Sequence, residues 1–165
     1  MRFAPAVKCP AAVLLFALAS AAPAHAQQNK QIISGTWYED RAFGFGNPNN
    51  DLLLTFTQTP ANKFLNITLV TCSITSYNNQ LLADVILQTG TQSGYTDTAR
   101  PQSVRGAAST QTGIYNYYSV VTQTYYKVGP GRFPGLEIQA PYSAVSNTSA
   151  FINAHCTIVG ELSDN

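Results

Sequence analysis

Apolar and polar positions alternate in short runs along most of the chain, and segments rich in Gly, Pro and Asn separate these runs. The most β-like run after the N-terminus is FLNITLVTCSI, residues 64–74. Its alternating positions are apolar on both faces, which is typical of a strand at the centre of a sheet. We therefore expect the other strands to pack around it. Its predicted faces are residues 65, 67 and 69 on one side and residues 70, 72 and 74 on the other.

Similar runs, rich in β-branched and aromatic residues, predict the remaining strands. No stretch after the N-terminus has a sustained period of 3.6, so we expect no helix. The pattern predicts an all-β fold, an antiparallel β-sandwich of about seven or eight strands, with an up-and-down β-barrel as the alternative. The other predicted strands are residues 32–41, 52–57, 81–88, 114–128, 136–139 and 151–162, and the predicted loops and turns are residues 43–50, 59–62, 77–79, 90–113 and 128–135.

The predicted loop 90–113 differs from the rest of the chain, because it has almost no large apolar residues and is rich in Thr, Ser, Gln and Gly. Loops of this length are uncommon inside compact domains and are often functional. The loop contains Arg100 and Arg105. It is either a solvated loop or edge hairpin, or a binding loop.

The first 26 residues have the three parts of a secretory signal peptide. Arg2 and Lys8 are basic, residues 11–22 are almost entirely apolar, and Ala24-His25-Ala26 fits an A-x-A cleavage site. The apolar run is shorter than the ~20 residues that span a bilayer. We therefore predict cleavage near Ala26, a secreted or periplasmic location, and a mature chain of residues 27–165 that forms one β-sandwich domain without a transmembrane segment.

Few charges remain after the leader is removed: seven Lys and Arg against eight Asp and Glu. Without a basic stripe, a nucleic-acid partner is not expected. The polarity of the chain comes from Thr, Ser, Asn and Gln, which suits an exported β protein.

Two cysteines remain in the mature chain, Cys72 and Cys156, because Cys9 lies in the leader. A pair of cysteines in an exported chain predicts a disulfide. The loop that it closes has 85 residues, counting both ends, and the loop-entropy model gives about 4.5 kcal/mol of stabilisation. Their wide separation and apolar neighbours favour a structural bridge over a redox or metal site.

Catalytic chemistry has little support in the sequence. His155 is the only histidine of the mature chain, and strand alternation places it on the face opposite to Cys156, toward solvent. We therefore predict no catalytic residue, no metal site and no cofactor. A secreted hydrolase remains an alternative, because two carboxylates about 5 to 10 Å apart are sufficient for glycoside hydrolysis. The acids in predicted strands that folding could bring together are Glu39, Asp84, Glu137 and Glu161.

Tyrosines give the clearest indication of binding. An exposed tyrosine can stack on a sugar or anchor a protein partner, because it combines an apolar ring with a polar tip. In the predicted strand 114–128, alternation places three tyrosines on one face and Tyr118 and Tyr126 on the other. We therefore predict an exported non-enzymatic binding or surface-interaction module for a carbohydrate or another protein. The candidate binding residues are Tyr115, Tyr117, Tyr125, Trp37, Arg100 and Arg105.

Residues 33–38, ISGTWY, resemble the opening strand of streptavidin-like biotin binders, and the Gly35-x-Trp37 pattern resembles the start of lipocalins. Both families are up-and-down barrels that hold a small ligand. The resemblance implies an alternative function, a ligand-holding barrel with a cavity lined by Trp37 and other aromatic residues. Avidins line their site with several tryptophans, whereas Trp37 is the only one here, so biotin itself is not the expected ligand.

Overall fold

The computed structural model describes residues 31–33, 35–46, 50–104, 107–141 and 150–164. The predicted signal peptide and Arg105 lie outside these ranges. The described residues form ten strands and no helix. The strands are β1 (Gln31–Ile33), β2 (Trp37–Gly46), β3 (Asp51–Thr55), β4 (Lys63–Tyr77), β5 (Asp84–Gly90), β6 (Asp97–Ser103), β7 (Ala107–Thr112), β8 (Tyr115–Val128), β9 (Phe133–Gln139) and β10 (Ile152–Asp164).

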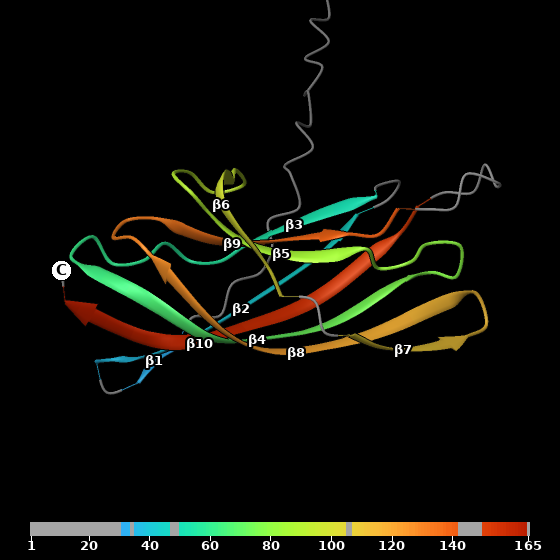
Figure 1. The fold of residues 1–165 in the computed structure, drawn as a ribbon, viewed down its shortest axis with the longest axis horizontal. Coiled ribbons are helices and arrows are strands. Elements are labelled where there is room, and N and C mark those ends of the chain that lie inside the picture. The colour runs from blue at the N-terminus through green and yellow to red at the C-terminus, as the bar shows by residue number, and fades with distance from the viewer. Residues whose placement is uncertain (1–30, 34, 47–49, 105–106, 142–149, 165) are drawn as a thin grey trace, which may run out of the picture.

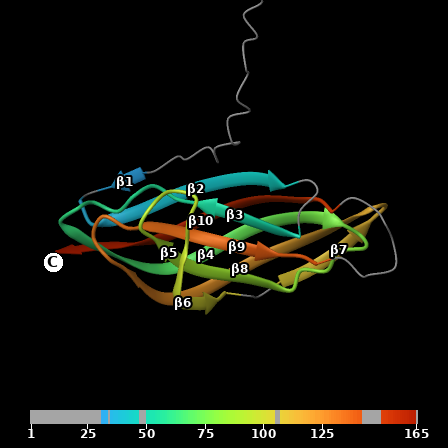
Figure 2. The ribbon, with the colours of Figure 1, turned by 90° about the horizontal axis from the view of Figure 1, so that it is seen from above.

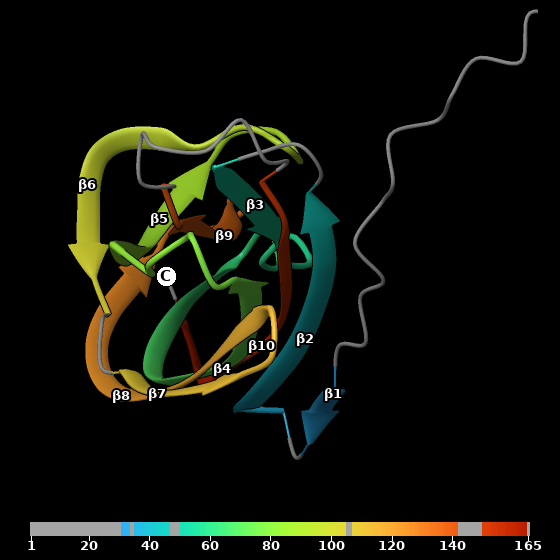
Figure 3. The same ribbon diagram turned by 90° about the vertical axis from the view of Figure 1, so that its right-hand side faces the viewer.

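The strands form two antiparallel sheets that face each other (Figure 1). The large sheet has the order β1-β2-β10-β4-β8-β7, and the small sheet has the order β3-β9-β5-β6. Figure 2 shows that most strands of both layers run along the long axis of the molecule, whereas β6 crosses this axis, as the end-on view of Figure 3 shows. The predicted all-β sandwich is confirmed. The barrel alternative is wrong, because the two sheets remain separate layers.

The core lies between the sheets and consists of inward-facing apolar side chains from both. Burying this apolar surface is the main driving force for folding. The largest fully buried apolar side chains include Tyr38, Phe56, Leu54, Leu65, Ile67, Ile74, Leu87, Leu136, Ile138, Ile152 and Ile158.

The central strand β4 changes face in its middle. The ladder register shifts between Ile67 and Leu69, against both β8 and β10. Such an irregularity reverses the inside–outside alternation beyond it. The prediction of two oppositely directed apolar faces is therefore wrong: β4 lies at the centre of the large sheet, but the apolar side chains before and after Thr68 face the same core. The buried ones are Leu65, Ile67, Val70, Cys72 and Ile74.

Gly160 of β10 pairs with Ile67 at this irregularity. A Cβ atom on Gly160 would overlap the backbone carbonyl of Asn66. Only glycine therefore fits at this position of β10, next to the register shift of β4.

Two predicted elements near the start of the chain have wrong boundaries. The predicted strand 32–41 is a hairpin of β1 and β2, because Gly35 adopts a positive φ of 75° at the turn. The predicted loop 43–50 begins inside β2, which continues to Gly46. Gly44 serves packing between the sheets: a Cβ there would lie 2.9 Å from Leu54 Cδ2. In the sequence, Gly44 indicates a loop. In the structure it lies inside a strand, where the lack of a side chain lets the two sheets approach closely.

The predicted loop 90–113 contains two strands, β6 and β7. Each is an edge strand, β6 of the small sheet and β7 of the large sheet. Polar side chains suit edge strands, because one side of such a strand is open to water. The prediction of a single loop is wrong. The two strands lie at sheet edges, but they belong to different sheets and so do not form with each other the edge hairpin considered as the alternative. The predicted hairpin turn 77–79 is also a turn, but it leads from β4 of one sheet to β5 of the other.

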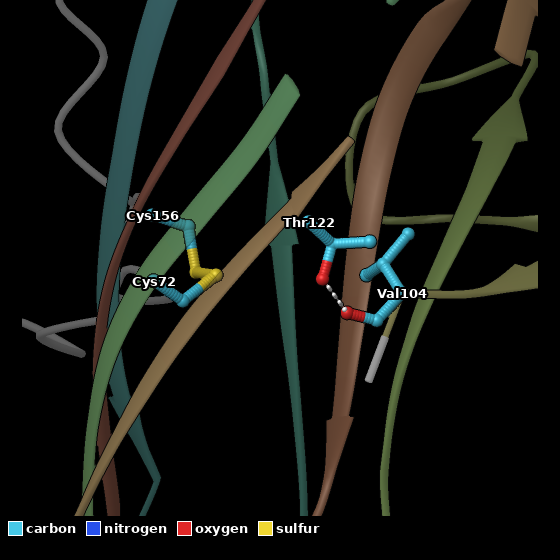
Figure 4. Close-up of a disulfide and its surroundings, with 4 residues drawn as sticks. All are labelled: Cys72, Val104, Thr122 and Cys156. Carbon is cyan, nitrogen blue, oxygen red and sulfur yellow. Dashed lines mark hydrogen bonds between the residues drawn. A yellow bond between two sulfur atoms is a disulfide. The ribbon is translucent and has the colours of Figure 1, made fainter. Parts of the chain in front are cut away.

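Side-chain hydrogen bonds join the two sheets along the β6–β8 side, which forms one flank of the end-on view in Figure 3. The Thr122 hydroxyl donates to the carbonyl of Val104 at 2.7 Å (Figure 4). The Gln102 amide donates to the Thr124 hydroxyl at 2.8 Å, and the Tyr126 hydroxyl donates to the carbonyl of Arg100 at 2.8 Å. Three inward-facing residues of β8 thus hold the edge of the opposite sheet.

A buried carboxylate joins the sheets on the β2–β3 side. Asp40 is fully buried, and it accepts hydrogen bonds from the backbone N–H of Thr57 at 2.7 Å and from the Tyr38 hydroxyl at 3.2 Å. Its other oxygen accepts from the N–H of Arg41 at 2.8 Å. Burial, with a smaller contribution from the adjacent Asp40 carboxylate, raises the pKa of Tyr38 well above its usual value.

The predicted disulfide is confirmed. Cys72 and Cys156 are direct cross-strand partners in β4 and β10, with Cα atoms 4.1 Å apart, and a disulfide joins them (Figure 4). Both residues are buried. The bridge therefore links two adjacent strands inside the core of the sandwich.

Candidate functional site

Four aromatic rings form a contiguous cluster on the outer face of the large sheet. The ring of Tyr77 stacks on that of Tyr115, with centroids 5.6 Å apart and an interplanar angle of 18°. Phe151 lies 5.4 Å from Tyr77 and 6.1 Å from Tyr115, and Tyr117 lies 6.4 Å from Tyr115 in an edge arrangement. We call these four residues the aromatic cluster.

The ladder register brings these rings together. Tyr77 and Tyr115 are direct partners in β4 and β8, and Tyr117 follows Tyr115 on the same face of β8. Phe151 immediately precedes β10, whose first residue pairs with the neighbour of Tyr77. The cluster therefore lies where β4 ends and where β8 and β10 begin, at the right-hand end of the large sheet in Figure 1.

A buried amide fixes the backbone under the cluster. Gln80 is fully buried; its side-chain nitrogen donates to the carbonyl of Ala140 at 2.8 Å, and its side-chain oxygen accepts from the N–H of Phe151 at 2.7 Å. Its own carbonyl accepts from the Asn116 amide at 2.9 Å. Gln80 thus ties together the segments that carry Phe151, Tyr77 and Tyr115. Because buried polar groups are costly without partners, this network gives the site a defined geometry.

The aromatic surface continues across the sheet to β2. The register forms one row of cross-strand partners, Phe45, Asn153, Thr75 and Tyr117, from β2 through β10 and β4 to β8. Phe45 is 60% exposed and Tyr117 is 44% exposed. In the neighbouring row, Phe43 stacks on His155 with centroids 5.5 Å apart. We call the combined surface the aromatic face: Phe43, Phe45, Ser73, Thr75, Tyr77, Tyr115, Tyr117, Ser119, Phe151, Asn153 and His155.

The aromatic face carries almost no charge. Apart from its tyrosines, His155 is its only residue with an acid–base side chain. The first charged residues beyond it on β2 are Arg41 and Glu39, which form an ion pair at 2.8 Å. The face thus combines exposed rings with neutral hydroxyl and amide groups.

Of the five predicted binding residues that the structure describes, it brings together two, Tyr115 and Tyr117. Tyr125 is 90% exposed, but it lies ten residues from Tyr115 along β8, ~33 Å for an extended strand. Trp37 is 40% exposed at the start of β2, opposite Glu161. It lies outside the core and lines no interior ligand site.

Arg100 lies in β6 of the opposite sheet, away from the aromatic face. Its guanidinium carbon lies 5.5 Å from the ring centroid of Tyr126, whose hydroxyl bonds the Arg100 carbonyl. This cation–π contact is part of the join between the sheets. Arg105 lies outside the described residues.

Sequence reasoning missed Tyr77, Phe151, Gln80 and Phe45. Tyr77 lies in the predicted turn 77–79, Gln80 directly follows that turn, and Phe45 lies in a predicted loop. No local pattern shows that Tyr77 pairs with Tyr115, because that pairing depends on the register of distant strands. His155, by contrast, is exposed beside Asn153 and Thr157, as alternation predicts.

Three of the four strand acids, Glu39, Asp84 and Glu137, have structural partners. Glu39 pairs with Arg41, and Glu161 is exposed near Trp37. On the outer face of the small sheet, Asp84 accepts from the Ser103 hydroxyl at 2.6 Å. Glu137 accepts from the amides of Gln88 and Gln139 at 2.7 and 2.8 Å. Among the described residues, no group of three or more His, Cys, Asp or Glu side chains could hold a metal ion.

Comparison with known protein families, curated proteins and solved structures finds no match to this chain. In the part of the chain that the structure describes, no helix is long and apolar enough to cross a membrane.

Proposed function

We propose that this protein is an exported, non-enzymatic binding module and that the aromatic face is its ligand-binding surface. The observation that carries the proposal is the aromatic cluster on the outside of a sheet: Tyr77, Tyr115 and Phe151 are in mutual contact, and Tyr117 lies against Tyr115. Tyrosines on a rigid support provide large contact area at a low entropic cost, because each has only two side-chain torsions. The buried Gln80 network provides that support here.

The leader and the disulfide support export. The N-terminal 26 residues have the pattern of a cleaved signal peptide, and Cys72–Cys156 bridges the core. Disulfides persist in the periplasm and outside the cell, and they are rare in a reducing cytosol. The ligand would thus be met outside the cytoplasm, with the mature chain beginning at Gln27.

The test compares two tyrosine variants of the mature, oxidised protein. Tyr115→Ser combined with Tyr117→Ser removes two rings of the cluster, whereas Tyr125→Ser removes an exposed tyrosine on the same face of the same strand but outside the cluster. Calorimetry and immobilised-protein binding would be run against neutral and acidic oligosaccharides and a displayed random-peptide library. We expect at least one probe to bind the wild type and the Tyr125→Ser variant and to lose binding to the double variant. Equal binding by all three proteins would contradict the proposal.

A hydrolase is the second candidate, favoured by the register of the small sheet. Asp84 pairs with Gln139 and Ile86 pairs with Glu137, so Asp84 and Glu137 are diagonal neighbours on one outer face, a relation that places Cα atoms about 7–8 Å apart. Side chains at such positions can bring two carboxylates to the separation of about 5 to 10 Å that glycoside hydrolysis requires. Hydrolysis of a glycan by the wild type that is abolished by Glu137→Gln would establish it.

A further inference from the structure

The row from Phe45 to Tyr117 has a defined chemical order. Its four members come from four adjacent strands, so its ends lie three strand spacings apart, about 14 Å. Exposed rings occupy the two ends, while Asn153 and Thr75 provide an amide and a hydroxyl between them. A single small ring cannot contact both ends, and the row therefore suits an extended ligand.

The neutrality of the row and its neighbours excludes ligands that need charge for recognition. Phosphate, sulfate and carboxylate groups are bound by Arg and Lys in forked or clustered arrangements, and the aromatic face has neither residue type. Anionic lipid surfaces and nucleic acids are unsuitable for the same reason.

A protein partner fits the row less well than a carbohydrate. Protein interfaces place their apolar and aromatic anchors at a central dry core and their polar groups at the rim. The row has the reverse order, with polar Asn153 and Thr75 in the centre and rings at both ends. A sugar chain matches this order, because each pyranose presents apolar C–H faces to a ring and hydroxyl groups to amides and hydroxyls.

We propose that the aromatic face binds a neutral polysaccharide whose chain runs across the strands of the large sheet, from Tyr117 on β8 to Phe45 on β2. This inference rests on the proposed function and names its ligand class. One sugar stacks on Tyr117 within the aromatic cluster, another stacks on Phe45, and the sugars between them exchange hydrogen bonds with Thr75 and Asn153. Binding has no requirement for a metal ion and makes no covalent bond.

The geometry requires affinity to depend on chain length. A monosaccharide can contact one end of the row only, whereas an oligosaccharide long enough to reach both rings gains from both. Removing one end ring should then weaken binding of the long chain by about tenfold, the usual size of a lost ring contact with its buried area. Binding of the monosaccharide at the other end should not change.

The test is affinity electrophoresis of the mature protein in gels that contain β-1,3-glucan, β-1,4-glucan, xylan, galactomannan or an acidic pectin. Calorimetry with oligosaccharides of increasing length would follow for the polysaccharide that retards it. The variants are Phe45→Ala and Tyr117→Ala, with Tyr125→Ala as the matched control. All three side chains are exposed, so folding should be preserved, which circular dichroism would check. We expect retardation by a neutral polysaccharide, reduced about tenfold in affinity by either end variant and unchanged in the control.

Four outcomes would overturn the inference. Retardation by the acidic polysaccharide alone would contradict a neutral ligand, and equal affinity for short and long chains would contradict an extended site. A third outcome is that no neutral polysaccharide retards the protein, while selected peptides bind the face and lose binding to Tyr117→Ala. This result would overturn the inference and leave the proposed function intact. If neither sugars nor peptides bind the face, both fail.

Discussion

Tyr77 and Tyr115 are direct cross-strand partners, and their rings stack at 5.6 Å on the outside of the large sheet. Aromatic pairs in this position stabilise a sheet by up to about 1 kcal/mol. The same pair is the centre of the aromatic cluster, so one contact serves both the fold and the proposed binding surface. Because the two effects are linked, variants must be tested for stability as well as for binding.

Replacing Gln80 with leucine should destabilise the protein by about 2–3 kcal/mol, because the N–H of Phe151 and the carbonyl of Ala140 would lose their buried partner. Urea unfolding would measure the loss, and near-UV circular dichroism should show a weaker aromatic signal as Phe151 loses its fixed position. The matched control is Gln123→Leu, an exposed glutamine on β8, with an expected change within about 0.5 kcal/mol. Equal effects of the two substitutions would contradict the role assigned to Gln80.

Gly160→Ala should cost about 2–3 kcal/mol or prevent folding, because its Cβ would overlap the backbone of Asn66 and neither strand can shift cheaply. Chemical denaturation of the purified variant is the measurement. Gly129→Ala is the control, because its Cβ would have its nearest contact at 3.5 Å, with the flexible Arg132 side chain. If Gly160→Ala is as stable as Gly129→Ala, β10 does not approach β4 as described.

Breaking the disulfide should lower the free energy of unfolding by about 2–5 kcal/mol. The change is either reduction of the mature protein or the double substitution Cys72→Ala with Cys156→Ala. Urea midpoints with and without dithiothreitol would measure it. Dithiothreitol should lower the urea midpoint of the wild type and leave that of the double variant unchanged. A lower midpoint in both proteins would show that the reductant does not act through this disulfide.

Alkaline pH should destabilise the protein through Tyr38. Burial raises the pKa of this group in the folded state, whereas its unfolded value is about 10. The contribution of protonated Tyr38 to the free energy of unfolding is therefore complete below pH 10. It is lost as the pH rises above 10, because only the unfolded state then releases the proton. The slope approaches about 1.4 kcal/mol per pH unit.

Unfolding by urea at pH 8, 10 and 11 would test this dependence. Tyr38→Phe should be less stable than the wild type at pH 8, because Asp40 loses a donor, but its stability should fall less steeply with pH. Burial also raises the pKa of Tyr126, so part of the slope should remain. An identical slope in both proteins would mean that Tyr38 is not shielded from solvent.

The alternation of apolar and polar residues along the sequence predicted much of the fold. It failed where pairing with neighbouring strands shifts the register of a strand. In β8 the alternation is unbroken, so sequence alone placed Tyr117 and Tyr125 on one face and Tyr118 and Tyr126 on the other. The structure confirms this division, with the second pair facing inward. In β4 the register shift at Thr68 reverses the faces, and nothing in residues 64–74 encodes the partner strands that require it.

The disulfide could be predicted because only two cysteines, Cys72 and Cys156, lie outside the predicted leader. The aromatic cluster could not, because it depends on which residue of β4 lies opposite Tyr115. Composition favoured tyrosines as binding residues, but it could not distinguish Tyr117, which lies in a cluster, from Tyr125, which stands apart on the same strand.

The most direct test of the central claim is a ¹H–¹⁵N NMR titration of the mature, oxidised protein with the neutral oligosaccharide that binds most tightly. We predict that the shifted amide signals map to the aromatic face, along the row from Tyr117 through Thr75 and Asn153 to Phe45, while the signal of Tyr125 stays fixed. Shifts confined to the small sheet around Asp84 and Glu137, or shifts around Tyr125 and Trp37, would contradict the account.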